Sequence, residues 1–121
     1  MDKCKQRMFK LAERFKSSRS AFIALGDETR QLIIIALLES DHNGIRVGEI
    51  TEKTHLSRPA VSNHLRILKN VGIINMRREG TKNYYYVNSD ETQWRELKDL
   101  MNYIYEIVQD VNCSKNEEEN F

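Results

Sequence analysis

The sequence predicts a mostly helical α+β fold, a winged helix-turn-helix with a two-stranded β-hairpin as the wing and additional helices at both ends of the chain. Apolar residues recur at helical spacing before Gly72, the period changes to two after it, and helical spacing returns after Asn88. The length of 121 residues, 40% of them apolar, fits one domain. We expect that domain to span residues 1–113 and an acidic flexible tail to span residues 114–121.

Three helices are expected in the first third of the chain. Met8, Leu11 and Phe15 recur at spacings of three and four residues, which predicts an amphipathic first helix. The serine-rich stretch 17–20 interrupts it before a second apolar face begins. Asp27 is expected to cap a buried third helix, because its carboxylate can accept the amide hydrogens of the first helical turn.

A short helix, a tight turn and a longer helix come next. The short helix follows a loop at residues 40–44 and is expected to end near His55. Ser57 caps the longer helix, and Pro59 lies in its first turn, where a missing amide hydrogen removes no helical hydrogen bond. The apolar stripe of this helix consists of Val61, Leu65, Leu68 and Val71.

A β-hairpin and a last helix complete the fold. Alternation after Gly72, turn residues at 79–83 and a tyrosine-rich run predict two strands with a basic tip. The last helix carries a narrow apolar stripe that suits packing against another helix. We expect a dimer interface on the first and last helices, with packing onto the chain's own core as the alternative. The expected interface residues are Met8, Leu11, Phe15, Trp94, Leu97, Met101, Ile104 and Val108.

The net charge of +1 conceals a strong segregation of charge along the chain. Residues 1–20 carry a net +5 and residues 57–88 another +5, whereas residues 21–56 carry −3 and residues 89–121 carry −6. A neutral molecule of this kind can still present a strongly positive face to phosphates. We expect the acidic end of the chain to keep non-specific attraction to phosphates weak.

The longer helix has the composition of a DNA recognition helix. Its first turns expose short polar and hydrogen-bonding side chains, and arginine and asparagine match the base edges of the major groove. We expect base reading by Arg58, Ala60, Ser62, Asn63 and His64. Other cations on this helix and on the hairpin are better placed for the DNA backbone. The expected backbone contacts are Ser57, Arg66, Lys69, Arg77, Arg78 and Lys82.

Two other classes of function are considered. A winged-helix module that binds a protein partner is the alternative to a DNA-binding regulator, and only a DNA-binding domain must lose affinity steeply with salt. An enzyme is not expected. Ser62 and His64 are two residues apart on a helix and do not face each other, and no nucleophile–base pair or phosphate-binding glycine motif occurs in the sequence.

The sequence resembles the ArsR/SmtB family of winged-helix transcriptional repressors over residues 22–87. The resemblance lies in LGDETR at residues 25–30, in LSRPAVSNHLRIL at residues 56–68 and in the wing pattern that begins at Arg78 and leads to Tyr85. It implies a homodimer, formed by the first and last helices, that binds an inverted-repeat DNA operator and releases it when it senses a ligand.

The metal sites of such regulators have no counterpart in this sequence. The positions that match the paired cysteines of the metalloid sensors hold Arg46 and Gly48, and the last helix contains no histidine. Transition metals prefer imidazole and thiolate, so we expect no metal and no cofactor. The histidines His42, His55 and His64 are scattered along the chain.

The two cysteines leave one alternative open. Cys4 precedes the first helix and Cys113 follows the last, so the pair is either a thiol-based metalloid or redox switch or two ordinary reduced thiols. The amino-terminal residues lack the pattern of a signal peptide, and no apolar run approaches the length of a membrane span. We therefore expect a cytoplasmic protein without a membrane partner.

Overall fold

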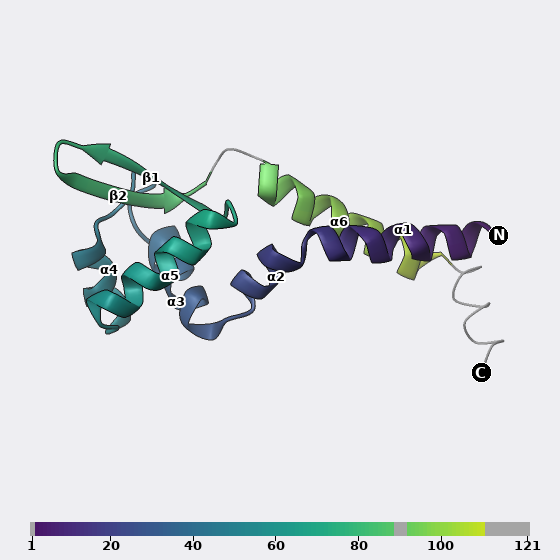
Figure 1. Cartoon of the computed structure of the whole chain (residues 1–121), viewed down its shortest axis with the longest axis horizontal. Coiled ribbons are helices and arrows are strands. Elements are labelled where there is room, and N and C mark those ends of the chain that lie inside the picture. Colours follow the sequence, from purple (N-terminus) through teal and green to yellow (C-terminus); the bar gives the residue numbers. More distant parts are fainter. Residues whose placement is uncertain (1, 89–91, 111–121) are drawn as a thin grey trace. The chain divides into compact units, whose positions relative to one another are not determined.

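The computed structural model describes residues 2–88 and 92–110, and these fall into two compact units (Figure 1). Of these described residues, those between 20 and 93 form one unit, and residues 2–19 belong with residues 94–110 to the other. Six helices and two strands occur in the described part of the chain. They are α1 (Lys3–Ser17), α2 (Arg19–Leu25), α3 (Glu28–Leu38), α4 (Val47–Thr54), α5 (Arg58–Asn70), β1 (Ile74–Glu79), β2 (Lys82–Val87) and α6 (Thr92–Gln109).

The core of the unit at residues 20–93 lies between α3, α4, α5 and the start of the hairpin. Its apolar side chains come from buried faces of the three helices and from the residues that enter the hairpin. Burying such a side chain contributes about 1.5–3 kcal/mol. The largest fully buried side chains in this unit are Ile33, Ile50, Val61, Leu65, Leu68, Ile73 and Ile74.

The helix boundaries confirm the predicted caps. Oδ1 of Asp27 accepts the amide hydrogen of Arg30 at 2.9 Å, and Oγ of Ser57 accepts that of Ala60 at 3.3 Å. Beyond α5, Gly72 has a φ of 81°. The amides at positions 72 and 73 donate back to the carbonyls of residues 69 and 68, which is a Schellman motif.

The strands of the hairpin are longer than predicted. Glu79 pairs with Lys82, so only Gly80 and Thr81 lie between the strands, whereas the sequence predicts turn residues at 79–83. Polar residues at the ends of both strands resemble turn residues in composition, and this explains the error. Gly80 adopts a φ of 62°, which permits the tight connection.

The loop before α4 is joined to the second strand by an isolated β-bridge. Ile45 and Tyr85 exchange two backbone hydrogen bonds, of 3.0 and 2.8 Å. Gly44, directly before this bridge, has a φ of 107°, and a Cβ atom on it would lie 3.0 Å from the carbonyl oxygen of Tyr85. Glycine is therefore required at this position by both conformation and space.

Within the other unit, side chains of α1 and α6 contact each other. The hydroxyl of Tyr103 donates to the carbonyl oxygen of Arg7 at 3.0 Å, and the guanidinium of Arg14 lies 4.9 Å from the centre of the Tyr103 ring. Arg7 also forms an ion pair with Asp110. Among the described residues, no helix combines the length and apolarity that a membrane span requires.

The stripe predicted on α6 is divided between two faces. Leu97 is buried, as are Leu100 and Ile107, which the predicted stripe does not contain. Met101 and Val108 are 53% and 63% exposed. The expected domain at residues 1–113 stays a prediction, and the expected tail at residues 114–121 lies outside the described residues.

Candidate nucleic-acid interface

The first turns of α5 present the predicted base-reading side chains in two different environments. Arg58, Ser62 and Asn63 are exposed, Ala60 is half-buried, and His64 is half-buried as well. Because the Ser57 cap and Pro59 fix the start of the helix, these positions form a well-defined surface. The surface is polar and carries no acidic side chain in its first turn.

His64 faces the corner between α2 and α3. Its Nδ1 atom is 3.5 Å from Nη1 of Arg30, a residue of α3. Arg30 also forms an ion pair with Asp27, whose Oδ2 atom is 3.9 Å from Nη2. The backbone hydrogen bond from Arg30 lowers the pKa of Asp27; burial opposes this effect, and the positive charge of Arg30 lowers the pKa further. The histidine therefore belongs to a polar cluster that connects the recognition helix to the preceding helices.

Asn63 and Arg66 form a pair on the exposed side of α5. Nη2 of Arg66 donates to Oδ1 of Asn63 at 2.7 Å. The pair leaves the amide nitrogen of Asn63 available as a hydrogen-bond donor. Lys69 is exposed one turn beyond Arg66, in the last turn of the helix.

The cations of the hairpin differ in how firmly they are held. The guanidinium of Arg77 lies 4.7 Å from the centre of the Tyr84 ring, and its Nε donates to Glu79 at 3.0 Å. Nε of Arg78 donates to the carbonyl oxygen of Gly80 at 3.1 Å. Lys82 is exposed. All three cations therefore lie near the tip of the hairpin, as predicted, but Arg77 is partly neutralised.

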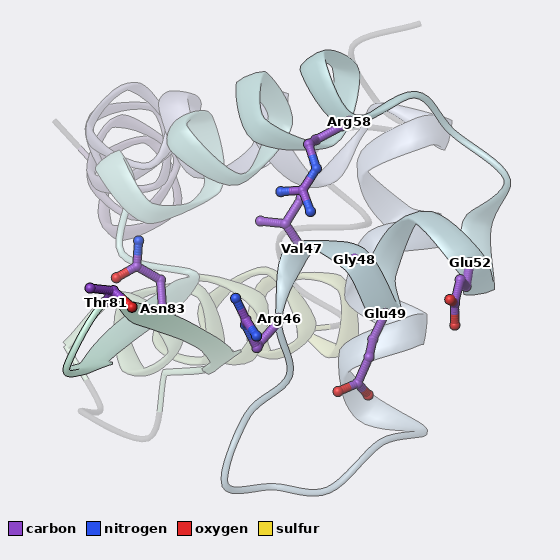
Figure 2. Close-up of a pocket in the computed structure, with 8 residues that line it drawn as sticks. All are labelled: Arg46, Val47, Gly48, Glu49, Glu52, Arg58, Thr81 and Asn83. Carbon is purple, nitrogen blue, oxygen red and sulfur yellow. The ribbon is translucent and has the colours of Figure 1, made fainter.

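Sequence reasoning missed a pocket between the start of α4, the start of α5 and the hairpin. Its volume is about 470 Å³, and Arg46 and Arg58 both line it (Figure 2). The sequence marks Arg46 only as a position whose side chain cannot bind a metal. An arginine directly before an uncapped helix is a sequence pattern that could have drawn attention to it. The lining residues are Arg46, Val47, Gly48, Glu49, Glu52, Arg58, Thr81 and Asn83.

The residues considered for a metal site lie apart. His42 is exposed in a loop beside Asp41, and His55 ends α4 with a φ of 59°. Within residues 2–88 and 92–110, no group of three or more histidine, cysteine or acidic side chains is arranged to hold a metal ion. Cys4 lies in the first turn of α1 and is not a free thiol, whereas Cys113 lies outside the described residues.

Residues 27–76 match the family described as "Bacterial regulatory protein, arsR family". An HTH-type transcriptional regulator of Methanocaldococcus jannaschii is 36% identical to this chain over 81 residues, which cover 67% of this chain and 89% of the relative. The transcriptional repressor SdpR of Bacillus subtilis is 35% identical over 74 residues, which cover 61% of this chain and 79% of SdpR.

A third relative is similar in both sequence and structure. The transcriptional activator HlyU of Vibrio cholerae is 32% identical over 98 residues, which cover 78% of this chain and 86% of HlyU. The solved structure of reduced HlyU from this organism superimposes with a TM-score of 0.57 at 28% identity, covering 76% of this chain and 90% of the HlyU chain. The fold, the recognition helix and these relatives agree: the chain belongs to the ArsR family and is a DNA-binding transcriptional regulator.

Proposed function

We propose that the protein is a homodimeric repressor that binds an inverted-repeat operator and places the start of α5 in the major groove. The observation that carries this proposal is the polar, exposed start of α5 beside a basic hairpin in the same compact unit. In a helix-turn-helix, the second helix enters the groove while the first crosses the backbone. These roles fall to α5 and α4, and the hairpin extends toward a neighbouring phosphate row or minor groove.

The roles of the individual side chains follow from their positions. Ala60 can contact a thymine methyl group, and Ser62 and the amide nitrogen of Asn63 can donate to base edges. Arg58 and His64 were expected to read bases as well, but each also contacts or faces another helix, and their roles are considered below. The backbone contacts are assigned to Ser57, Arg66, Lys69, Arg77, Arg78 and Lys82.

The proposed dimer interface uses the exposed apolar side chains of α1 and α6. Phe9 is 65% exposed, and Met101, Tyr105 and Val108 are each more than half exposed. Large apolar side chains grouped on a helix face are typical of an interface with another protein. Two copies of the reading surface, related by a two-fold axis, would bind half-sites about one helical turn apart.

Selection of bound duplexes from a random DNA pool tests this function directly. A palindromic site with half-sites about 10 base pairs apart is expected. Affinity for the selected site should fall steeply with salt, because each neutralised phosphate releases counterions. Absence of any enriched sequence, together with salt-independent binding of a protein partner, would favour the protein-interaction module instead. A reporter gene placed behind the selected site distinguishes repression from activation.

A thiol-based switch at Cys4 and Cys113 is a second candidate, supported by the observation that Cys4 is not a free thiol. Operator affinity should then differ between protein treated with a thiol reductant and protein treated with an oxidant. The Cys4→Ser variant should lose this difference. Equal affinities of the wild-type protein under both treatments would show that the cysteines do not regulate DNA binding.

A further inference from the structure

The pocket between α4, α5 and the hairpin brings together two arginines from different elements. Arg46 is the last residue before α4, and Arg58 is the first residue of α5. Figure 2 shows the Arg58 side chain extending from its own helix toward Val47 and Gly48 at the start of α4. A Cβ atom placed on Gly48 would lie 3.8 Å from Nη2 of Arg58. The head of Arg58 is therefore beside the first turn of α4.

The two guanidinium groups have no partner within the described residues. The side chain of neither Arg46 nor Arg58 forms a hydrogen bond or an ion pair there, although Glu49 and Glu52 line the same pocket. In Figure 2 the two carboxylates point away from the arginine heads. An arginine without a partner carries five unused donors in a planar fork, which matches the oxygens of a phosphate.

The remaining walls of the pocket add polar groups. The start of α4 has no side-chain cap, and the amide hydrogens of Val47 and Gly48 have no acceptor within the described part of the chain. On the hairpin side, Oδ1 of Asn83 is buried and is the one such side-chain atom there without a hydrogen-bond partner. This oxygen is an acceptor, so it suits a hydrogen-bond donor such as an arginine of the same pocket and not a phosphate oxygen.

The geometry points to a binding site for one phosphate group of the DNA backbone, and Arg46 and Arg58 would hold that phosphate jointly. This inference rests on the proposed function, because α4 crosses the backbone only if α5 lies in the major groove. Arg58 then positions the recognition helix on the backbone and does not read a base. The amides at the start of α4 face the same phosphate, since a helix start favours negative charge.

The β-bridge between Ile45 and Tyr85 fixes the α4 side of this phosphate site relative to the hairpin side. Arg46 follows the bridge directly on one side, and Asn83 lies two residues before Tyr85 on the other. A backbone contact of this kind would fix how deeply the recognition helix enters the groove, because it ties α4, α5 and the hairpin to a single phosphate.

The test compares Arg46→Gln, Arg58→Gln and the double variant with the wild-type protein. Binding to a short random-sequence duplex is measured by fluorescence anisotropy over a series of KCl concentrations. Each single variant should bind roughly three- to tenfold more weakly, and the double variant should lower the salt slope by about 0.9 in total, because both arginines share one phosphate. Lys53→Gln, which removes one charge from an exposed residue at the far end of α4, serves as the matched control.

Several outcomes would overturn the inference. A loss of about two units of slope in the double variant would mean that the arginines contact separate phosphates. Unchanged binding in both single variants, with the wild type still binding DNA, would refute the phosphate site and leave the proposed function intact. A wild type that fails to bind any duplex would refute both.

Two further measurements strengthen the test. Gly48→Ala adds a methyl group that meets Arg58 without a clash and occupies space the proposed phosphate would fill, so it should weaken DNA binding while the circular dichroism spectrum stays unchanged. Inorganic phosphate distinguishes the source of the anion. If it raised the melting temperature of the wild type and not of Arg46→Gln, while Arg46→Gln bound DNA normally, the pocket would be a site for a free anion and not for the DNA backbone.

Discussion

The imidazole of His64 lies against the guanidinium of Arg30, with Nδ1 of His64 3.5 Å from Nη1 of Arg30. Because arginine only donates hydrogen bonds, Nδ1 is the acceptor in this contact. Arg30 also donates from Nε to the carbonyl oxygen of Ala24 at 2.8 Å and from Nη2 to that of Ile23 at 3.1 Å. The recognition helix is thereby connected to the carbonyl end of α2 through one arginine.

Replacing Arg30 by glutamine should destabilise the fold by about 2–3 kcal/mol, because two carbonyl groups lose a charged donor. The Arg30 side chain is only 11% exposed, so water restores these bonds poorly. Urea unfolding monitored by circular dichroism measures the change. Arg66→Gln, on the exposed side of α5, is the control and should cost less than about 0.5 kcal/mol. Equal effects of the two substitutions would show that Arg30 does not hold this corner.

Acid should weaken the fold through Asp27. The backbone hydrogen bond from Arg30 lowers the pKa of this carboxyl group, so the folded protein holds its charged form more strongly than the unfolded chain does. The resulting stabilisation is complete above the pKa of the unfolded chain and is lost as the pH falls below about 4. Asp27→Asn keeps an acceptor for the cap but does not titrate. Urea unfolding should show a stability advantage of the wild type over this variant that shrinks in this range.

Gly72→Ala should destabilise the protein by about 1–2 kcal/mol. The φ of 81° at this position strains any side chain, and a Cβ atom would lie 3.3 Å from Cβ of Gln93. Gly48→Ala is the matched control, because its backbone is helical and alanine is favoured there by up to about 1 kcal/mol. Thermal unfolding of the two variants should therefore shift in opposite directions. A stabilised Gly72→Ala protein would contradict the Schellman geometry at the end of α5.

Lys82→Ala should weaken binding to all DNA sequences alike and reduce the salt slope by about one unit. The side chain is exposed on the hairpin, so the fold itself should be unaffected. Asn63→Ala should instead cost about 1–3 kcal/mol on the selected operator and relax specificity at one position. Titrations of the operator and of a scrambled duplex over a salt series separate the two effects. A sequence-specific loss in Lys82→Ala would require a base contact by the wing.

Charge placed on the exposed face of α6 should dissociate the proposed dimer. Met101→Glu introduces a carboxylate at a side chain that is 53% exposed, so the monomer should still fold. In an apolar interface the same carboxylate would be buried without a partner. Sedimentation equilibrium should show monomers, and operator affinity should fall. Asn102→Asp adds the same charge at a neighbouring exposed position and should remain dimeric; dissociation of both variants would point to net charge as the cause.

Sequence reasoning succeeded where the determinants are local. The caps at Asp27 and Ser57 and the left-handed residue at Gly72 were predicted because each depends on atoms within a few residues. The apolar stripe of α5 was predicted because helical spacing and burial coincide there. Each of these features can be derived from short-range chemistry alone.

The features that sequence reasoning missed depend on residues far apart in the chain. The neighbours of His64 and of Arg58 lie on other helices, so spacing along α5 does not identify them. On α6, the residues at 97, 100 and 107 and those at 101, 105 and 108 both recur at helical spacing. A single period therefore cannot distinguish the face that is buried within the chain from the face that is exposed.

The bridge between Ile45 and Tyr85 has a consequence for transplanting this wing into another protein. The two strands of the hairpin are consecutive in the sequence. The second strand also pairs on its other edge with Ile45, which lies forty positions before Tyr85. A chimera that carries only residues 74–87 would expose the backbone edge at Tyr85 to pairing with other chains, which is a common route to aggregation. A graft that also carries Gly44 and Ile45 would keep that edge closed.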